Sequence, residues 1–304
     1  MASLSIIVPV FNEAQNIPVL LAELRKYCPP GTSFLFVDDG STDETFQVIE
    51  TAAKTDKQVQ CISFSRNFGH QNALMAGMQA CKTDRAIIMD GDLQHPPSLI
   101  PQILEKLDAG YDLVQTKRLA TEKIAGGKKL LSRYFYGFIN SISDTRIEPN
   151  VADFKGFTRK VLDSVLQFKE RELFLRGIFS WIGFKTITLP FEAPPRLHGV
   201  TKYSYTKMMR LALKGTTSFS FKPLRIALFT GTLISLFAFG FALFALLAYF
   251  KGNTVPGWAS MIIAIMFLGG TQLLAIGLMG EYIASLFTET KQRPLFLIDK
   301  TINT

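Results

Sequence analysis

The sequence predicts an α/β domain with a mostly parallel sheet, followed by an amphipathic interfacial helix and two transmembrane helices. Three observations support this fold class. Apolar, β-branched segments alternate with amphipathic helical patterns in the N-terminal part of the 304-residue chain. Polar and acidic residues gather where these apolar segments end. Near the C-terminus, two long segments contain no charged residue.

The N-terminal domain is expected to alternate strands and helices up to residue 116. The strands are expected at residues 3–10, 33–37, 59–64, 85–89 and 111–116, and the helices from residue 16, from residue 43, and at 71–80 and 97–107. Such alternation is typical of a parallel sheet that has helices on both faces and ligands at the carboxyl ends of its strands. The residues directly after each strand are therefore the candidates for a binding site.

A basic region follows this alternation. Residues 111–225 hold 21 Lys or Arg against 9 Asp or Glu, net +12, whereas residues 1–110 hold 8 against 13, net −5. Two amphipathic helices are expected here, at 128–142 and 205–217. The first fits packing on the sheet and placement on a membrane surface equally well, and the second leads directly to the uncharged segments. Because the basic region adjoins a membrane span, its pattern favours lipid phosphate over nucleic acid as the partner.

Two transmembrane helices are predicted at residues 226–250 and 252–280, which contain no charged residue. A helix of about 25 residues is about 37 Å long and spans a hydrocarbon core of about 30 Å with some tilt; a buried pair of core helices is the alternative. Lys and Arg residues flank the pair of predicted helices, and the loop between the two helices contains only one basic residue, Lys251. Both termini are therefore expected in the cytoplasm, at the inner (plasma) membrane. The expected boundaries are a catalytic domain at 1–203, a juxtamembrane helix at 204–222 and an anchor with a cytoplasmic tail at 223–304.

Two carboxylates, Asp38 and Asp39, follow the second expected strand. At a strand end they can accept hydrogen bonds from ribose hydroxyls and a base N–H. An ordinary Asp-Gly turn followed by a helix cap explains the same residues. The chain has no glycine-rich phosphate loop after its first strand, so another feature must hold a nucleotide.

The fourth expected strand runs into a second acidic motif, Asp90, Gly91 and Asp92, with Gln94 two residues further on. Oxygen ligands at alternate positions suit Mg²⁺ or Mn²⁺, which bridges substrate phosphates. A solvated acidic turn is the alternative. Because both acidic motifs end strands of one sheet, they are expected at one edge, where they would form a nucleotide-sugar site.

Taken together, four segments resemble the family 2 glycosyltransferases of GT-A (Rossmann-like) fold. They are IIVPVFNE (6–13), VDDGSTD (37–43), SRNFGHQNAL (65–74) and DGDLQHP (90–96). Within that family the chain most resembles the bacterial and phage polyprenyl-phosphate glucosyltransferases of O-antigen (lipopolysaccharide) modification, and more distantly dolichol-phosphate mannose synthase. The resemblance extends over nearly the whole length, through 116–118, 151–154, 196–203 and 280–282.

The resemblance implies roles for individual residues. It implies nucleotide-sugar contacts at Pro9, Glu13, Asp38, Asp39, Asp90 and Gly91, metal ligands at Asp90, Asp92 and Gln94, and lipid-phosphate contacts at Lys117, Arg118, Arg133, Arg196 and Lys202. Guanidinium groups suit the last role because they grip phosphate bidentately. Asp92 and Asp153 are the catalytic candidates, and Asp153 is the family's candidate for a general base.

The implied reaction is inverting transfer of a hexose, glucose from UDP-glucose, onto undecaprenyl (polyprenyl) phosphate at the cytoplasmic membrane face. A phosphate monoester with a second pKa of about 6 is largely ionised at neutral pH, so its oxygen needs positioning more than deprotonation. Asp153 is therefore expected to orient the acceptor or the sugar. Glucose rests on resemblance alone, so GDP-mannose, UDP-galactose and UDP-aminosugar donors stay open, as does a homo-oligomer.

Two other functions fit part of the sequence. A processive polysaccharide synthase shares the acidic motifs but adds a Q-x-x-R-W segment, and neither Trp181 nor Trp258 follows an arginine. A non-catalytic membrane scaffold would keep the same fold. The presence of Asp90, Asp92 and Gln94 favours an enzyme over a scaffold.

Overall fold

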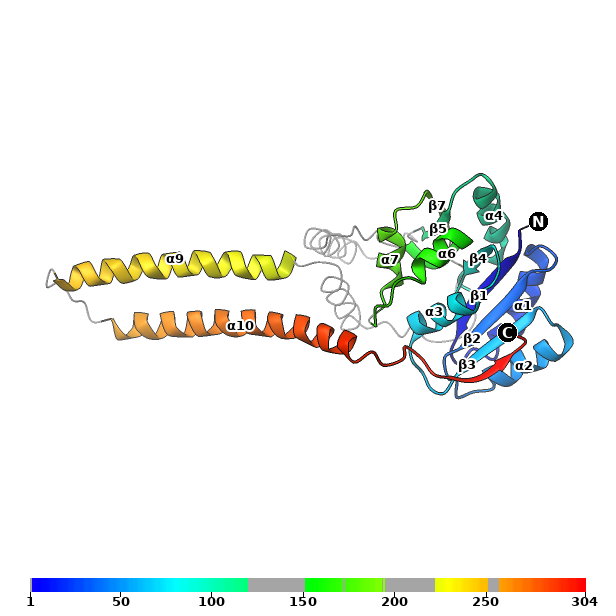
Figure 1. Ribbon diagram of the computed structural model, residues 1–304, viewed down its shortest axis with the longest axis horizontal. Helices are drawn as coiled ribbons and strands as arrows, with labels where there is room; N and C mark the ends of the chain where they lie inside the picture. Colours follow the sequence, from blue (N-terminus) through cyan, green and yellow to red (C-terminus); the bar gives the residue numbers. More distant parts are fainter. Residues whose placement is uncertain (1, 120–150, 172, 193, 195–221, 251–256) are drawn as a thin grey trace. The chain divides into compact units, whose positions relative to one another are not determined.

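The computed structural model describes residues 2–119, 151–171, 173–192, 194, 222–250 and 257–304 (Figure 1). The chain divides into two units, a sheet domain that includes Gln292–Thr304 and a pair of long helices. The amphipathic helices expected at 128–142 and 205–217 lie outside the described residues.

The sheet domain alternates strands and helices where the sequence predicts them. Its first part contains β1 (Leu4–Val10), α1 (Asn16–Tyr27), β2 (Ser33–Asp38), α2 (Thr45–Thr55), β3 (Val59–Phe64), α3 (His70–Ala80), β4 (Arg85–Ile88), η1 (Pro97–Leu99) and α4 (Ile100–Asp108). Its second part contains β5 (Leu113–Arg118), β6 (Val151–Thr158), α6 (Arg159–Val165), α7 (Leu175–Trp181), β7 (Thr186–Phe191) and β8 (Ile298–Ile302).

One sheet of eight strands organises the domain, in the order β7-β5-β6-β4-β1-β2-β3-β8. Neighbouring strands are parallel in the central part of the sheet, which runs from β4 through β1 and β2 to β3. This arrangement confirms the mostly parallel sheet. β6 runs antiparallel to both β4 and β5, and β8 runs antiparallel to β3. Because β6 runs the opposite way, its first residues lie at the sheet edge where β4, β1 and β2 end.

Different helices cover the two faces of the sheet. Alternate residues of β1 (Leu4, Ile6, Val8 and Val10) join a core cluster with apolar residues of α1, α2 and α4. On the other face Ile7 packs against α3, where Gly77 leaves no room for a Cβ. Burial of each such Leu, Ile or Val side chain stabilises the fold by about 1.5–3 kcal/mol. The strand ends are therefore held by a continuous core.

The C-terminal residues, which the sequence analysis places in the tail of the anchor, pair with the sheet as β8. Asn303 Nδ2 donates hydrogen bonds to the carbonyl oxygens of Ala53 and Val59, at 3.2 and 3.0 Å. The Phe296 ring stacks on Phe64, with 4.9 Å between centroids. β8 thereby covers the edge of β3, which would otherwise expose unpaired backbone groups.

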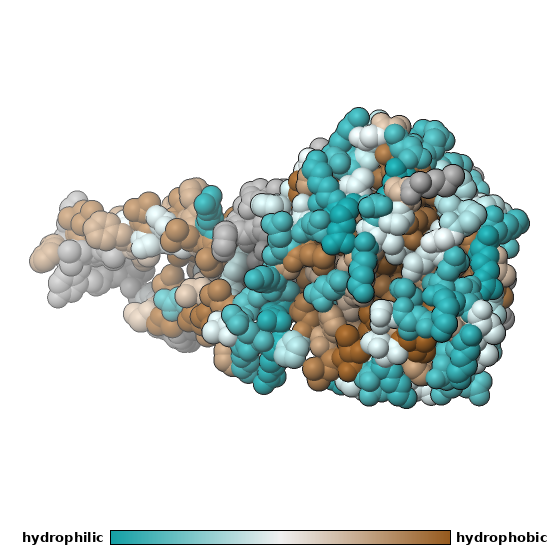
Figure 2. Space-filling model, turned by 45° about the vertical axis from the view of Figure 1, so that its right-hand side comes forward, coloured by the Kyte–Doolittle hydropathy of each residue, from teal (hydrophilic) through white to brown (hydrophobic). Residues whose placement is uncertain are grey.

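The two long helices are α9 (Lys222–Phe250) and α10 (Trp258–Thr290). Both contain a segment long and apolar enough to cross a membrane, and neither segment is buried. Phe237 is 80% exposed and Leu274 is 78% exposed, and Figure 2 shows the apolar surface of this pair. These helices fit a membrane-associated protein, as the sequence predicts.

Candidate functional site

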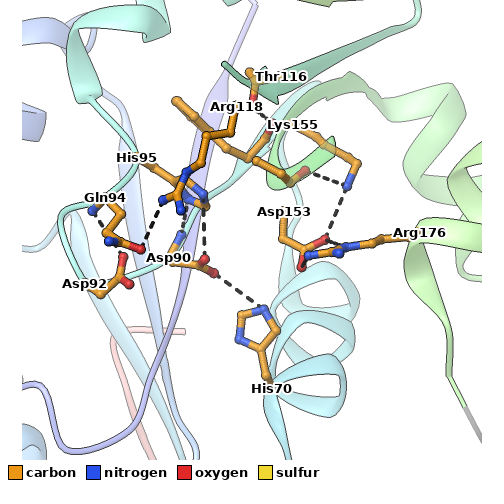
Figure 3. A network of polar contacts seen from close by, with 12 residues as sticks. His70, Asp90, Asp92, Gln94, His95, Thr116, Arg118, Asp153, Lys155 and Arg176 are labelled. Atoms are coloured by element: carbon orange, nitrogen blue, oxygen red, sulfur yellow. Dashed lines mark hydrogen bonds and ion pairs between the residues drawn. The ribbon is translucent and has the colours of Figure 1, made fainter. Parts of the chain in front are cut away.

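The acidic loop after β4 is closed by its own hydrogen bonds. His95 Nδ1 accepts a hydrogen bond from the backbone N–H of Asp90 at 3.0 Å, and Asp92 Oδ1 accepts one from the N–H of Gln94 at 3.1 Å. Leu93 has a φ of 60°, in the left-handed region. This turn returns the chain to the sheet while both carboxylates stay at the strand end (Figure 3).

Gly91 places the acidic loop directly against the end of β1. A Cβ on Gly91 would lie 2.8 Å from Val10 Cγ1 and 3.5 Å from the carbonyl oxygen of Pro9. A side chain at this position would therefore push the loop away from β1. The structure thus brings together Pro9, Gly91 and the two acidic residues of the loop.

Asp38 and Asp39 are buried residues, at 2% and 4% exposure, and other groups of the protein donate hydrogen bonds to their carboxylate oxygens. Asp38 accepts from the Ser41 N–H at 3.0 Å and from Ser63 Oγ at 2.8 Å. Asp39 accepts from the backbone N–H groups of residues 68 and 69, at 2.7 and 2.9 Å. Burial raises the pKa of Asp39, although these backbone hydrogen bonds oppose the shift. Both residues shape the loops after β2 and β3, and their contact with a nucleotide stays a prediction.

Glu13 braces the loop after β1. Its carboxylate accepts a hydrogen bond from Asn16 Nδ2 at 2.5 Å, and its N–H donates to Thr45 Oγ1 at 2.9 Å. The neighbouring Asn12 Oδ1 accepts from the Thr42 N–H at 2.8 Å. The loops after β1 and β2 are thus fastened to each other, which holds the predicted nucleotide side of the site in place.

Asp90 and Asp92 are suited to hold a divalent cation whose remaining ligands are oxygen atoms of the substrate phosphates. Asp90 Oδ1 is buried, and no described residue donates a hydrogen bond to it; His70 Nε2 lies 3.5 Å away. Over the described ranges, no group of three or more His, Cys, Asp or Glu side chains is placed to hold a metal. Mg²⁺ commonly binds through one or two carboxylates plus phosphate oxygens, so two carboxylates are sufficient here.

Gln94 connects the acidic loop to the end of β5. Its Oε1 accepts a hydrogen bond from Arg118 Nη2 at 3.0 Å. The structure therefore brings Arg118, a predicted phosphate ligand, next to the acidic loop, with Lys117 preceding it on β5. The place of Gln94 as a metal ligand stays a prediction. The other predicted phosphate ligands, Arg133, Arg196 and Lys202, lie outside the described residues.

Asp153, near the start of β6, is held by two cationic side chains. Arg176, from α7, donates from Nε to Oδ1 at 3.0 Å and from Nη2 to Oδ2 at 2.7 Å. Lys155 Nζ lies 3.4 Å from Oδ1 and is itself only 1% exposed. Burial alone would raise the pKa of Asp153, but the charges of Lys155 and Arg176 outweigh it and hold the pKa below its ordinary value. Figure 3 shows this cluster beside Asp90.

Four residues of this network, His70, His95, Lys155 and Arg176, carry no role in the sequence analysis. The two histidines lie within segments that resemble the family, which is a usable signal, and His95 also belongs to the segment of the acidic motif. Arg176 has no such signal, because its partner lies 23 residues earlier and only the packing of α7 brings them together.

Comparison with known proteins gives a consistent result. The model of the family described as Glycosyl transferase family 2 matches residues 5–166. The bactoprenol glucosyl transferase of Shigella phage SfX is 38% identical over 299 residues, 97% of this chain and 98% of that protein. A prophage bactoprenol glucosyl transferase homolog of Escherichia coli (strain K12) is 38% identical over 301 residues, 98% of each chain.

Among solved structures, a mannosyltransferase from Pyrobaculum calidifontis in complex with GDP-Man and Mn²⁺ is similar in fold. Its TM-score is 0.50 at 19% identity, over 96% of this chain and 86% of that chain. This structural similarity confirms the GT-A fold that the sequence predicts.

Proposed function

This chain belongs to glycosyl transferase family 2, and from that membership and the geometry of the site we propose that it transfers glucose from UDP-glucose to undecaprenyl phosphate with inversion. One observation carries the proposal. The acidic loop is packed against the end of β1 through Gly91 and is tied to Arg118 through Gln94. Two carboxylates and a guanidinium therefore meet at one sheet edge. Relatives named bactoprenol glucosyl transferases support the sugar and the lipid acceptor.

We propose that Asp90 and Asp92 hold Mg²⁺ or Mn²⁺. When bound, such an ion neutralises charge on the diphosphate and makes it a better leaving group. The buried Asp90 Oδ1, to which no described residue donates a hydrogen bond, supports this placement. Arg118 is positioned by Gln94 to bind a phosphoryl oxygen near the same edge.

The proposed transfer needs no proton acceptor. An oxygen of the acceptor phosphate forms a bond to the anomeric carbon while the bond from that carbon to the diphosphate oxygen breaks, and the electron pair leaves with UDP. At neutral pH most of the acceptor is a dianion, because its second pKa is about 6, so the attacking oxygen carries no proton. Asp153, fixed by Arg176 and Lys155, is proposed to orient groups in the site.

The two apolar helices are proposed to anchor the enzyme in the inner (plasma) membrane with both termini in the cytoplasm. Their composition supports a membrane location. Lys and Arg residues lie at the start of the first helix and directly after the second, and this distribution supports the proposed orientation. The nucleotide sugar and the phosphate end of the lipid would then meet at the cytoplasmic face.

A donor panel tests the proposal. Purified full-length protein in detergent is given undecaprenyl phosphate, Mn²⁺ or Mg²⁺, and in turn UDP-glucose, UDP-galactose, a UDP-aminosugar and GDP-mannose, and the lipid product is identified by mass spectrometry. We expect a hexosyl lipid from UDP-glucose. A product only with another donor would correct the sugar. Asp92→Ala is included because a non-catalytic scaffold would be indifferent to it.

A further inference from the structure

His95 directs both of its ring nitrogens at one residue of the acidic loop. Nδ1 accepts the hydrogen bond from the Asp90 N–H at 3.0 Å, and Nε2 lies 3.7 Å from Asp90 Oδ2. The His95 side chain is 5% exposed, so solvent does not compete for these contacts. One imidazole therefore meets both the backbone and the carboxylate of a proposed metal ligand.

The chemistry of this hydrogen bond determines where the His95 proton lies. A backbone N–H can only donate, so Nδ1 must offer its lone pair. The proton of the neutral ring is then on Nε2, the nitrogen that faces the Asp90 carboxylate.

The His95 ring is itself held by two buried aromatic side chains. It stacks on Phe154, with 5.2 Å between centroids and 18° between planes, and meets Phe191 edge-on at 5.9 Å. Phe154 follows Asp153 on β6, and Thr116 Oγ1 donates to its carbonyl oxygen at 2.8 Å. Aromatic pairs of this kind contribute about 0.5–1.5 kcal/mol beyond their buried area. The ring orientation is therefore set by β6 and β7, outside the acidic loop.

We infer that His95 is a positioning residue that fixes Asp90 and thereby sets the affinity of the acidic loop for a divalent cation. The inference rests on the proposed function, which places the cation at Asp90 and Asp92. Partners that orient a metal ligand from outside the coordination sphere typically contribute about 10–100-fold to metal affinity. This contribution to metal affinity comes from the Nδ1 lone pair, which accepts the Asp90 hydrogen bond. The aromatic contacts of the ring serve only to orient Nδ1.

Two substitutions separate the acceptor from the ring. His95→Asn puts an amide oxygen near the place of Nδ1, where it can accept from the Asp90 N–H, but removes the stacked ring. His95→Phe keeps a ring against Phe154 but has no acceptor. The full-length protein in detergent, with saturating UDP, is titrated with Mn²⁺ by calorimetry, and its thermal unfolding midpoint is measured in parallel.

If His95 acts through its acceptor, His95→Phe weakens Mn²⁺ binding more than His95→Asn does. If His95 acts only by packing, His95→Asn weakens binding more. We expect His95→Phe to raise the Kd for Mn²⁺ by about 10–100-fold, and His95→Asn to raise it less despite a lower unfolding midpoint. If His95→Asn weakens Mn²⁺ binding more than His95→Phe, or if His95→Phe binds Mn²⁺ like the wild type, the inference is overturned.

Phe191→Leu provides a matched control. It disturbs the same aromatic cluster, since Phe191 contacts both His95 and Phe154. We expect a lower unfolding midpoint with a Kd for Mn²⁺ raised much less than in His95→Phe, because the Nδ1 acceptor is kept, and a Kd raised as much as in His95→Phe would assign the effect to packing. Wild-type protein that binds no Mn²⁺ would contradict the proposed metal site itself, whereas intact binding in wild type and His95→Phe alike contradicts only the role of His95.

Discussion

The guanidinium of Arg176 grips the carboxylate of Asp153 with two hydrogen bonds, from Nε to Oδ1 at 3.0 Å and from Nη2 to Oδ2 at 2.7 Å. A bidentate pair of this kind is among the stronger polar contacts in proteins. Lys155 adds a second cation at 3.4 Å. The family's candidate base is therefore an ionised carboxylate whose two oxygens already serve the protein, which favours a positioning role.

Asp153→Asn should lower turnover by less than the roughly 100-fold or more expected when a general base is lost. The pH profile distinguishes the two roles better than the rate. Because the pKa of Asp153 is held below its ordinary value, this carboxylate stays ionised over the working range. Turnover should rise through about pH 6 as the acceptor phosphate ionises, in the wild type and the variant alike. A change in the shape of the profile in Asp153→Asn would show that Asp153 accepts a proton.

Asp153→Ala should destabilise the domain more than Lys155→Met. The alanine leaves Lys155, 1% exposed, without its carboxylate partner. Breaking a buried pair in this way costs about 3–5 kcal/mol. Lys155→Met leaves Asp153 paired with Arg176 and costs less. The folded-state pKa of Asp153 is depressed, so its stabilisation is present above the ordinary carboxyl pKa of about 3.9 and is lost as the pH falls through the folded value. Thermal unfolding at pH 7 therefore measures the full difference, and equal midpoints would contradict the account.

Asp39→Asn should weaken UDP binding through the loop that it holds. Oδ1 of Asp39 accepts from the N–H groups of both Phe68 and Gly69, and Oδ2 accepts from Gly69 at 2.9 Å. The amide keeps one acceptor oxygen and replaces the other with an NH2 group, which cannot accept from these donors. A hydrogen bond to a charged group contributes about 1.5–3 kcal/mol, and the unfolding free energy should fall by about that amount. Calorimetric titration with UDP measures the affinity.

Asp84→Asn is the matched control for that experiment. Asp84 also accepts two hydrogen bonds, from the N–H and the Oγ of Ser3, but it lies before β4, at the opposite sheet edge. The Asp84→Asn substitution should leave the affinity for UDP unchanged. An equal loss of UDP affinity in both variants would show that general destabilisation, and not the loop after β3, explains the effect of Asp39→Asn.

The strand ends that carry the site were predictable because their signals are local. An apolar run followed by Asp-Gly or Asp-Gly-Asp marks both the end of a buried strand and the start of a turn, and β2 and β4 end within one residue of the expected places. The close approach of Gly91 to β1 was not predictable, because it depends on how neighbouring strands are staggered.

The remainder of the site depends on contacts between distant segments. The start of β6 lies beside the end of β4 because β6 runs antiparallel, and the sequence of residues 151–158 gives no sign of direction. Arg176 reaches Asp153 only through the packing of α7. β8 pairs with β3 across more than two hundred residues, and its short alternation of apolar and polar residues resembles an ordinary polar tail.

Asn303→Ala should loosen the C-terminal strand. The side chain donates to the carbonyl oxygens of Ala53 and Val59, and the backbone φ of 56° is one that alanine adopts reluctantly. Two hydrogen bonds of this type contribute about 1–3 kcal/mol together. We expect a lower unfolding midpoint and faster proteolysis after residue 292. Unchanged proteolysis would show that the backbone pairing of β8 alone holds the tail.

The transfer of radiolabelled glucose from UDP-glucose to undecaprenyl phosphate by the full-length protein tests the central claim most directly. We predict one labelled lipid with Mn²⁺ or Mg²⁺, none after chelation of the metal, and none with Asp92→Ala. The absence of a labelled lipid from the wild-type protein, or equal labelling by wild type and Asp92→Ala, would contradict the claim that this acidic loop performs the transfer.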